Sequence, residues 1–130
     1  MKFTLSWLND HLETKSDLNT IVETLTKIGL EVESVEDKSE AYKNFTVGKV
    51  LKAEKHPDAD KLKVCEVETN LGKFQVVCGA PNARAGMLGV FAPENSFIPG
   101  TELHLKKSKI RGIESCGMLV SEREMGISDE

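Results

Sequence analysis

The sequence predicts a mainly β protein, with a small α/β segment over residues 1–39 and a closed five-stranded barrel over residues 40–130. Short apolar runs of period two recur between residues 45 and 120, and this is the repeat of a half-buried strand. Glycine, proline and asparagine separate these runs. Residues 18–28 differ, because their apolar side chains recur at helical spacing.

The first segment is predicted as strand, helix, helix and strand. Residues 2–6 and 30–37 alternate like strands, and a short helix follows the first of them. The second helix begins after Ser16, the candidate N-cap, and ends at Gly29. Its apolar stripe is Leu18, Ile21, Val22, Leu25 and Ile28. Residues 1–39 are too few to cover this stripe, so we expect the segment to need a partner.

The barrel is predicted from five or more short strands. Residues 45–53 and 62–67 alternate on either side of a polar loop, 56–60, in which Pro57 stops the strand. Asn70-Leu71-Gly72 is a hairpin turn, and strands follow at 74–78, at 88–92 before Pro93, and near 103–105. Closure of so many short strands would remove exposed edges. The oligonucleotide/oligosaccharide-binding (OB) fold is the commonest barrel of this size.

Charge and cysteine content exclude several function classes. The net charge of −4 arises in residues 1–39, with four lysines against eight acids, because residues 40–130 have thirteen of each sign. A strong unspecific polyanion binder is therefore not expected. The three cysteines, Cys65, Cys78 and Cys116, form no CxxC pair, which argues against zinc. No signal peptide is visible, and no run approaches the ~20 apolar residues of a membrane span.

Catalytic, metal and cofactor sites are not predicted. His56, Asp58 and Asp60 have loose spacing for metal ligands, and turn formation accounts for them. Cys78 lacks a neighbouring basic cluster or helix start that would activate a nucleophile. Residues 79–86, GAPNARAG, lack the Lys-Ser/Thr ending of a nucleotide-triphosphate loop. We therefore expect no enzyme active site within this chain.

A basic cluster is the strongest candidate site. Its members are Lys106, Lys107, Lys109 and Arg111. If the last three lie on one strand, alternation places them on one face, as contacts with a phosphate backbone require. Arg84 and Asn82 can approach the same rim, and Lys61 and Lys63 are weaker candidates. The alternative interpretations are a solvated face for the cluster and simple turn formation for residues 82 and 84.

The aromatic residues favour a folded RNA over a single strand. Phe45, Phe74 and Phe91 fall in apolar strand patterns and are expected in the core, which leaves Tyr42 and Phe97 as exposed candidates. Proteins that stack successive bases usually present more aromatic side chains. Recognition by shape and phosphates therefore fits better.

Three spaced motifs carry a family resemblance. HPDADKL at 56–62, VCGAPNARAG at 77–86 and KIRGIESCGML at 109–119 resemble the OB-type tRNA-binding domain. The start, MKFTLSWLNDHL, and the later KIGLEVESVE at 27–36 resemble the N-terminus of the bacterial phenylalanyl-tRNA synthetase β subunits. The resemblance covers essentially the whole chain.

The resemblance implies an N-terminal fragment of a longer cytoplasmic subunit, in which later sequence completes residues 1–39. It implies tRNA and an α subunit, in an (αβ)2 tetramer, as partners. The parent enzyme joins phenylalanine to tRNA with ATP and magnesium, but its adenylating site belongs to the α subunit. A binding module without cofactors of its own is therefore expected. Two alternatives remain: an architectural module of the tetramer, and a free-standing dimeric tRNA-binding protein acting as an RNA chaperone or export factor.

Overall fold

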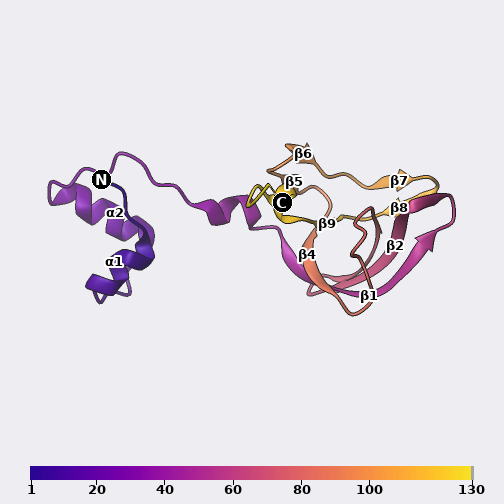
Figure 1. The fold of residues 1–130 in the computed structure, drawn as a ribbon. Helices are drawn as coiled ribbons and strands as arrows, with labels where there is room; N and C mark the ends of the chain where they lie inside the picture. The colour runs from indigo at the N-terminus through magenta and orange to yellow at the C-terminus, as the bar shows by residue number, and fades with distance from the viewer. Residues whose placement is uncertain (130) are drawn as a thin grey trace. The chain divides into compact units, whose positions relative to one another are not determined.

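The computed structural model describes residues 1–129. The chain divides into two compact units, Met1–Asp37 and Lys38–Glu130. The first unit contains α1 (Leu5–His11) and α2 (Leu18–Lys27). The second begins with a 3-10 helix, η1 (Lys38–Tyr42), and ends with α3 (Glu122–Met125). Between them lie β1 (Thr46–His56), β2 (Ala59–Thr69), β3 (Gly72–Cys78), β4 (Leu88–Ala92), β5 (Phe97–Ile98), β6 (Leu103–His104), β7 (Ser108–Ile110), β8 (Ile113–Ser115) and β9 (Met118–Val120) (Figure 1).

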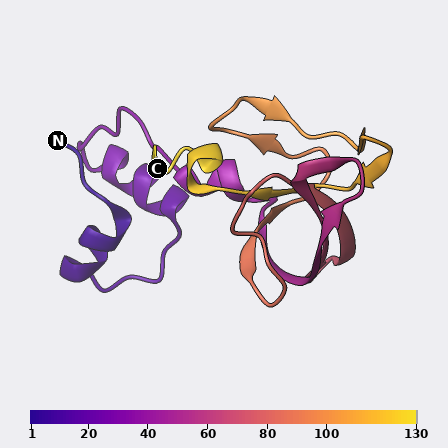
Figure 2. The same cartoon turned by 45° about the vertical axis from the view of Figure 1, so that its right-hand side comes forward.

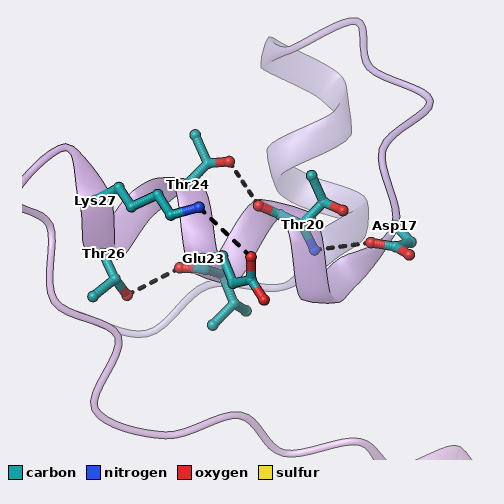
Figure 3. Close-up of polar contacts among 7 residues, drawn as sticks. Asp17, Thr20, Glu23, Thr24, Thr26 and Lys27 are labelled. Atoms are coloured by element: carbon teal, nitrogen blue, oxygen red, sulfur yellow. Dashed lines mark hydrogen bonds and ion pairs between the residues drawn. The ribbon is translucent and has the colours of Figure 1, made fainter.

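Local hydrogen bonds define the ends of α2. The Asp17 carboxylate accepts from the Thr20 amide at 2.8 Å, so Asp17 is the N-cap and the predicted cap at Ser16 is wrong by one residue (Figure 3). Gly29, at φ +97°, ends the helix as predicted. Glu23 and Lys27 form an exposed i,i+4 ion pair, which contributes little. No residue of α1 or α2 is buried.

The two strands predicted at 2–6 and 30–37 are wrong. Residues 1–4 have no regular structure, residues 5 and 6 belong to α1, and residues 30–37 form no strand. A strand is stabilised by hydrogen bonds to a neighbouring strand. Within the described part of the first unit, neither segment has such a neighbour, so the alternating pattern alone does not produce a strand.

The second unit contains a five-stranded antiparallel sheet in the order β3-β2-β1-β4-β9 and two two-stranded sheets, β5-β6 and β7-β8. The five-stranded sheet is curled, which confirms the predicted mainly β, OB-type fold (Figure 2). A register shift between Val50 and Lys52 marks a bulge in β1, and bulges increase strand bending. The predicted hairpin at residues 70–72 and the end of β4 before Pro93 are confirmed. The predicted loop at 56–60 is tighter than expected, because His56 already pairs with Ala59.

Residues 114–116, at the end of β8 and just after it, cover the β3 edge of the curled sheet. The Cys116 amide donates to the Gln75 carbonyl, and the Gln75 side-chain amide donates to the Glu114 carbonyl, both at 2.8 Å. Gly117 lies directly against β4, because a Cβ there would lie 2.6 Å from Phe91 Cζ. The core inside has two clusters of buried residues: Val50, Cys65, Val67, Val76, Cys78, Ala83 and Phe91, and Ala92, Ile98 and Val120.

Candidate nucleic-acid interface

The turn between β1 and β2 is built around a buried histidine. His56 is 2% exposed, and its Nδ1 accepts the Asp58 backbone N–H at 3.0 Å. An accepting Nδ1 leaves the ring proton of a neutral imidazole on Nε2. Nε2 therefore donates to the Ile110 carbonyl, 3.0 Å away. His56 thus joins the β1–β2 turn to the β7–β8 hairpin.

Arg111 makes a second bond between the same two turns. Residues 111 and 112 form the two-residue turn of the β7–β8 hairpin, with φ of +49° and +87°, as type I′ turns require. The Arg111 guanidinium donates to the Asp58 carbonyl at 2.8 Å. Arg111 is therefore not on the strand, and the predicted shared face with Lys107 and Lys109 is wrong for Arg111. The turn at Gly112 ends the alternation before it reaches residue 111.

The outward face of the hairpin is only partly cationic. Lys109 lies on β7 directly opposite Glu114, and Lys107 precedes the strand with its ammonium 3.4 Å from the Glu114 carboxylate. The hydrogen bond and charge of Glu114 raise the pKa of Lys107. Since cross-strand side chains share a face, one acid faces both lysines. Lys106 is exposed and lies just before Lys107.

Residues 79–86 form a loop that Lys63 holds in place. The Lys63 ammonium donates to the carbonyls of Pro81 at 3.1 Å and Ala83 at 2.6 Å. Ala83 is buried, and the Gly86 amide donates to the Val50 carbonyl at 2.7 Å. Lys63 therefore already has partners that orient its charge. We infer that it supports the loop more than it offers a free cation to a ligand.

The other predicted site residues of this region are exposed. Arg84 donates to the carbonyl of Asn82 at 3.3 Å within the same loop. Lys61, at the start of β2, has no partner among residues 1–129. The structure thus gathers Lys61, Lys63 and the 82–84 loop near the β1–β2 hairpin, where Arg111 also lies. Lys106 and Lys107 precede β7, at its end away from the Arg111 turn. There the charge of Glu94 also raises the pKa of Lys107.

The aromatic side chains differ from the prediction at one position. The Tyr42 hydroxyl donates to the Met125 carbonyl at 2.7 Å, and its ring lies 5.8 Å from Phe45, so Tyr42 is half-buried. Tyr42 is therefore not an exposed stacking residue. Phe97 is 42% exposed as predicted, but its ring packs against His104 at 4.9 Å. Phe91 is fully buried and stacks on Phe74 at 5.0 Å.

The cysteines are placed as structural residues. Cys65 and Cys78 are buried in the barrel, and burial raises the pKa of the Cys65 thiol. Burial also raises the pKa of Cys116. A raised pKa lowers the thiolate fraction, so neither Cys65 nor Cys116 has the character of an activated nucleophile. No group of three or more metal-ligating side chains occurs among the described residues.

Sequence analysis missed the role of His56. Its proximity to Pro57 and Asp58 indicated only a turn, whereas its ring contacts a residue 54 positions away. The sequence shows only a histidine before a proline that ends a strand. This local pattern contains no information about the contact of His56 with the Ile110 carbonyl.

Comparison with known families matches residues 45–130 to a family described as putative tRNA binding domain. The chain belongs to this tRNA-binding domain family. It is 60% identical over 131 aligned residues to the phenylalanine–tRNA ligase beta subunits of Brucella abortus and, over 132, of Mesorhizobium japonicum. The chain is covered completely in both alignments, but it spans only 16% of the length of these relatives.

Solved structures resemble the same domain. A MetRS-related protein from Pyrococcus horikoshii is 29% identical, with a TM-score of 0.50 over 67% of this chain and 76% of that one. An RNA ligase from Naegleria gruberi has a TM-score of 0.53 at 17% identity, over 63% of this chain and 29% of the ligase. This second likeness shows the fold alone.

No helix within residues 1–129 is both long enough and apolar enough to span a membrane.

Proposed function

We propose that the second unit binds folded tRNA through phosphate contacts from basic side chains around the β1–β2 turn and along residues 106–111. The observation that carries this proposal is the pair of bonds His56–Ile110 and Arg111–Asp58, which brings two basic segments from distant parts of the sequence together. The contacting cations are Lys61, Arg84, Lys106, Lys107, Lys109 and Arg111, with Asn82 and Lys63 shaping the adjoining loop.

Phosphate recognition is favoured over stacking of a single strand. Arginine and lysine contacts to phosphates position a folded RNA without reading its sequence. The half-buried Tyr42 and the paired Phe97 leave few aromatic faces for successive bases. The carboxylate of Glu114 beside Lys107 and Lys109 reduces the local positive charge. We therefore expect weak binding that depends on salt.

For the whole protein we propose the role of a phenylalanine–tRNA ligase β subunit. The names of the relatives support this role, and the enzyme would act in the cytoplasm with an α subunit in an (αβ)2 tetramer. It would use ATP and magnesium to join phenylalanine to tRNA. No group of three or more metal-ligating side chains occurs in residues 1–129, and residues 79–86 lack a nucleotide-triphosphate loop sequence, so we assign no residue of this chain to magnesium or ATP.

We further propose a domain boundary near residue 40, with residues 1–39 completed by later sequence of the subunit. The supporting observation is that neither α1 nor α2 buries a residue, although α2 has a continuous apolar stripe. Helices of this kind gain most of their stability from packing of that stripe. A longer chain that includes the later sequence should protect the α2 amides from hydrogen exchange, whereas residues 1–39 alone should exchange rapidly.

The test of tRNA binding is fluorescence anisotropy of labelled tRNA across a salt series, with a single-stranded RNA of equal length as control. Contacts to about three or four phosphates predict a slope of log K against log salt of roughly −3. Selective, salt-sensitive binding to tRNA is expected. Absence of binding at low salt would contradict the proposal.

An architectural role in the tetramer is the second candidate. The Lys107–Glu114 pair and the equal numbers of basic and acidic residues in 40–130 favour it. On this alternative, tRNA does not bind, but deleting the second unit weakens tetramer assembly measured by sedimentation. A free-standing dimer is separable by intact mass, because its native gene product would have the 14.3 kDa of this chain.

A further inference from the structure

A pocket of about 630 Å³ lies between the β1–β2 hairpin and the loop that follows β3. This pocket is lined by Ala53, Lys55, Asp60, Lys61, Leu62, Lys63, Gly79, Ala80 and Pro81. Its volume falls within the range of about 300–1,000 Å³ that is usual for small-ligand sites. It combines an apolar wall with three lysines and one aspartate, and such a wall and rim suit a flat apolar group attached to an anion.

The apolar wall is preformed. Leu62 is half-buried, and a Cβ at Gly79 would lie 3.5 Å from its Cδ2, so the loop passes directly against the leucine. The loop is held by the two bonds from Lys63 and by an amide–carbonyl bond from Ala83 to Ala80 at 3.2 Å. A wall that is ordered before binding avoids the entropy cost of ordering it with the ligand.

The rim carries cations that an anion can reach. The Lys61 side chain is exposed, and no ion pair engages it in the described part of the chain. Lys55 pairs with Asp60 at 2.8 Å, but both side chains are mostly exposed, so water screens the pair and a phosphate can compete for Lys55. Two ammonium groups therefore stand beside the apolar wall.

We propose that this pocket binds one unpaired nucleotide of the RNA, with its base against Leu62 and the loop and its phosphate at Lys61 and Lys55. The inference rests on the proposed tRNA binding and deepens it. A base inside a helix is stacked on both faces and cannot enter a pocket, whereas unpaired loop nucleotides can be turned outward. The basic hairpin would then supply affinity, and the pocket would select RNAs that present such a nucleotide.

The experiment uses the 130-residue chain and transcripts of a phenylalanine tRNA with 2-aminopurine at one unpaired loop position at a time. Fluorescence should rise at one position when the protein binds, because unstacking removes quenching. An abasic nucleotide at that position should weaken binding several-fold, because the base no longer buries apolar surface against Leu62 and the loop. Leu62→Gln should weaken binding to the intact tRNA by a similar factor and make it insensitive to the abasic change. Leu71→Gln, at an exposed leucine outside the pocket, is the matched control.

If the unaltered chain does not bind tRNA at all, the proposed function itself is contradicted. Two results overturn the pocket alone while salt-sensitive tRNA binding remains normal. In the first, no labelled position responds to the protein. In the second, the abasic nucleotide weakens binding equally for L62Q and for the unaltered chain. If L62Q does not fold, Gly79→Val replaces it, since Gly79 is exposed and not at positive φ. Its side chain would occupy the space beside Leu62.

Discussion

The two units of this chain use apolar residues in opposite ways. In Met1–Asp37, Trp7 and Ile28 are 56% and 66% exposed, and α1 and α2 contain no buried residue. In Lys38–Glu130, Phe91 and Ile98 are fully buried inside the curled sheet. Strands that curl into a barrel bury each other's side chains, but two short helices cannot enclose their own apolar stripe. Periodicity therefore predicts an element without predicting that its apolar face is covered.

The largest effect is expected from Phe91→Ala. Phe91 is fully buried and stacks on Phe74, so its truncation should lower the free energy of unfolding of the second unit by about 3–5 kcal/mol. Urea unfolding followed by circular dichroism measures this change. Leu88→Ala on the same strand, where the side chain is 68% exposed, should change it by less than about 0.5 kcal/mol.

His56→Ala tests whether the two turns are held together as described. The substitution removes the partly buried bonds to Asp58 and Ile110, and each such bond contributes about 0.5–1.5 kcal/mol. Amide hydrogen exchange in residues 108–115 should accelerate more than exchange in β4. Lys55→Ala, at the exposed neighbouring position, is the control. Equal exchange in both variants would mean that the His56 bonds do not hold the β7–β8 hairpin.

Reversal of Lys107 and Lys109 to glutamate locates RNA affinity within the second unit. We expect tRNA affinity to fall about tenfold or more, because two phosphate-facing cations become acids. Anisotropy at constant salt measures this loss. Lys52→Glu with Lys73→Glu makes the same charge change at exposed positions away from the hairpin and should have a smaller effect. Glu114→Gln should act in the opposite direction and strengthen binding, since it removes the carboxylate that pairs with Lys107.

The smallest effect is expected in the first unit, from Asp17→Ala. Hydrogen bonds from Thr20 lower the pKa of Asp17. The ionised carboxylate therefore stabilises α2 fully at pH values above the usual pKa of aspartate. This stabilisation is lost as the pH falls through the lowered pKa. D17A should reduce the helicity of residues 18–27 at neutral pH and remove this acid dependence, as measured by NMR chemical shifts. Ser16→Ala should leave both unchanged, and an equal effect of S16A would restore Ser16 as the cap. The second unit should be unaffected.

The residues that could be predicted are those whose environment is local. The α2 stripe, the Gly29 stop, the hairpin turn at residues 70–72 and the end of β4 at Pro93 all depend on neighbours within a few positions. Arg111 was misplaced because alternation was extended through a turn that only the positive φ at residues 111 and 112 reveals. Tyr42 was misplaced because its partner, Met125, lies 83 residues away.

The sequence by itself determined the mainly β class, the positions of β1 to β4, the family motifs and the identity of the candidate cations. These follow from backbone sterics, period-two patterning and spaced motifs, which act over short stretches. Only the tertiary structure decided which cations are free and which are engaged. Lys63 is bound to carbonyls of residues 81 and 83, Lys107 faces Glu114, and Arg111 holds Asp58. The reason is physical: a charge is oriented by whatever lies within hydrogen-bond distance, and closure of the barrel brings those partners there from distant parts of the chain.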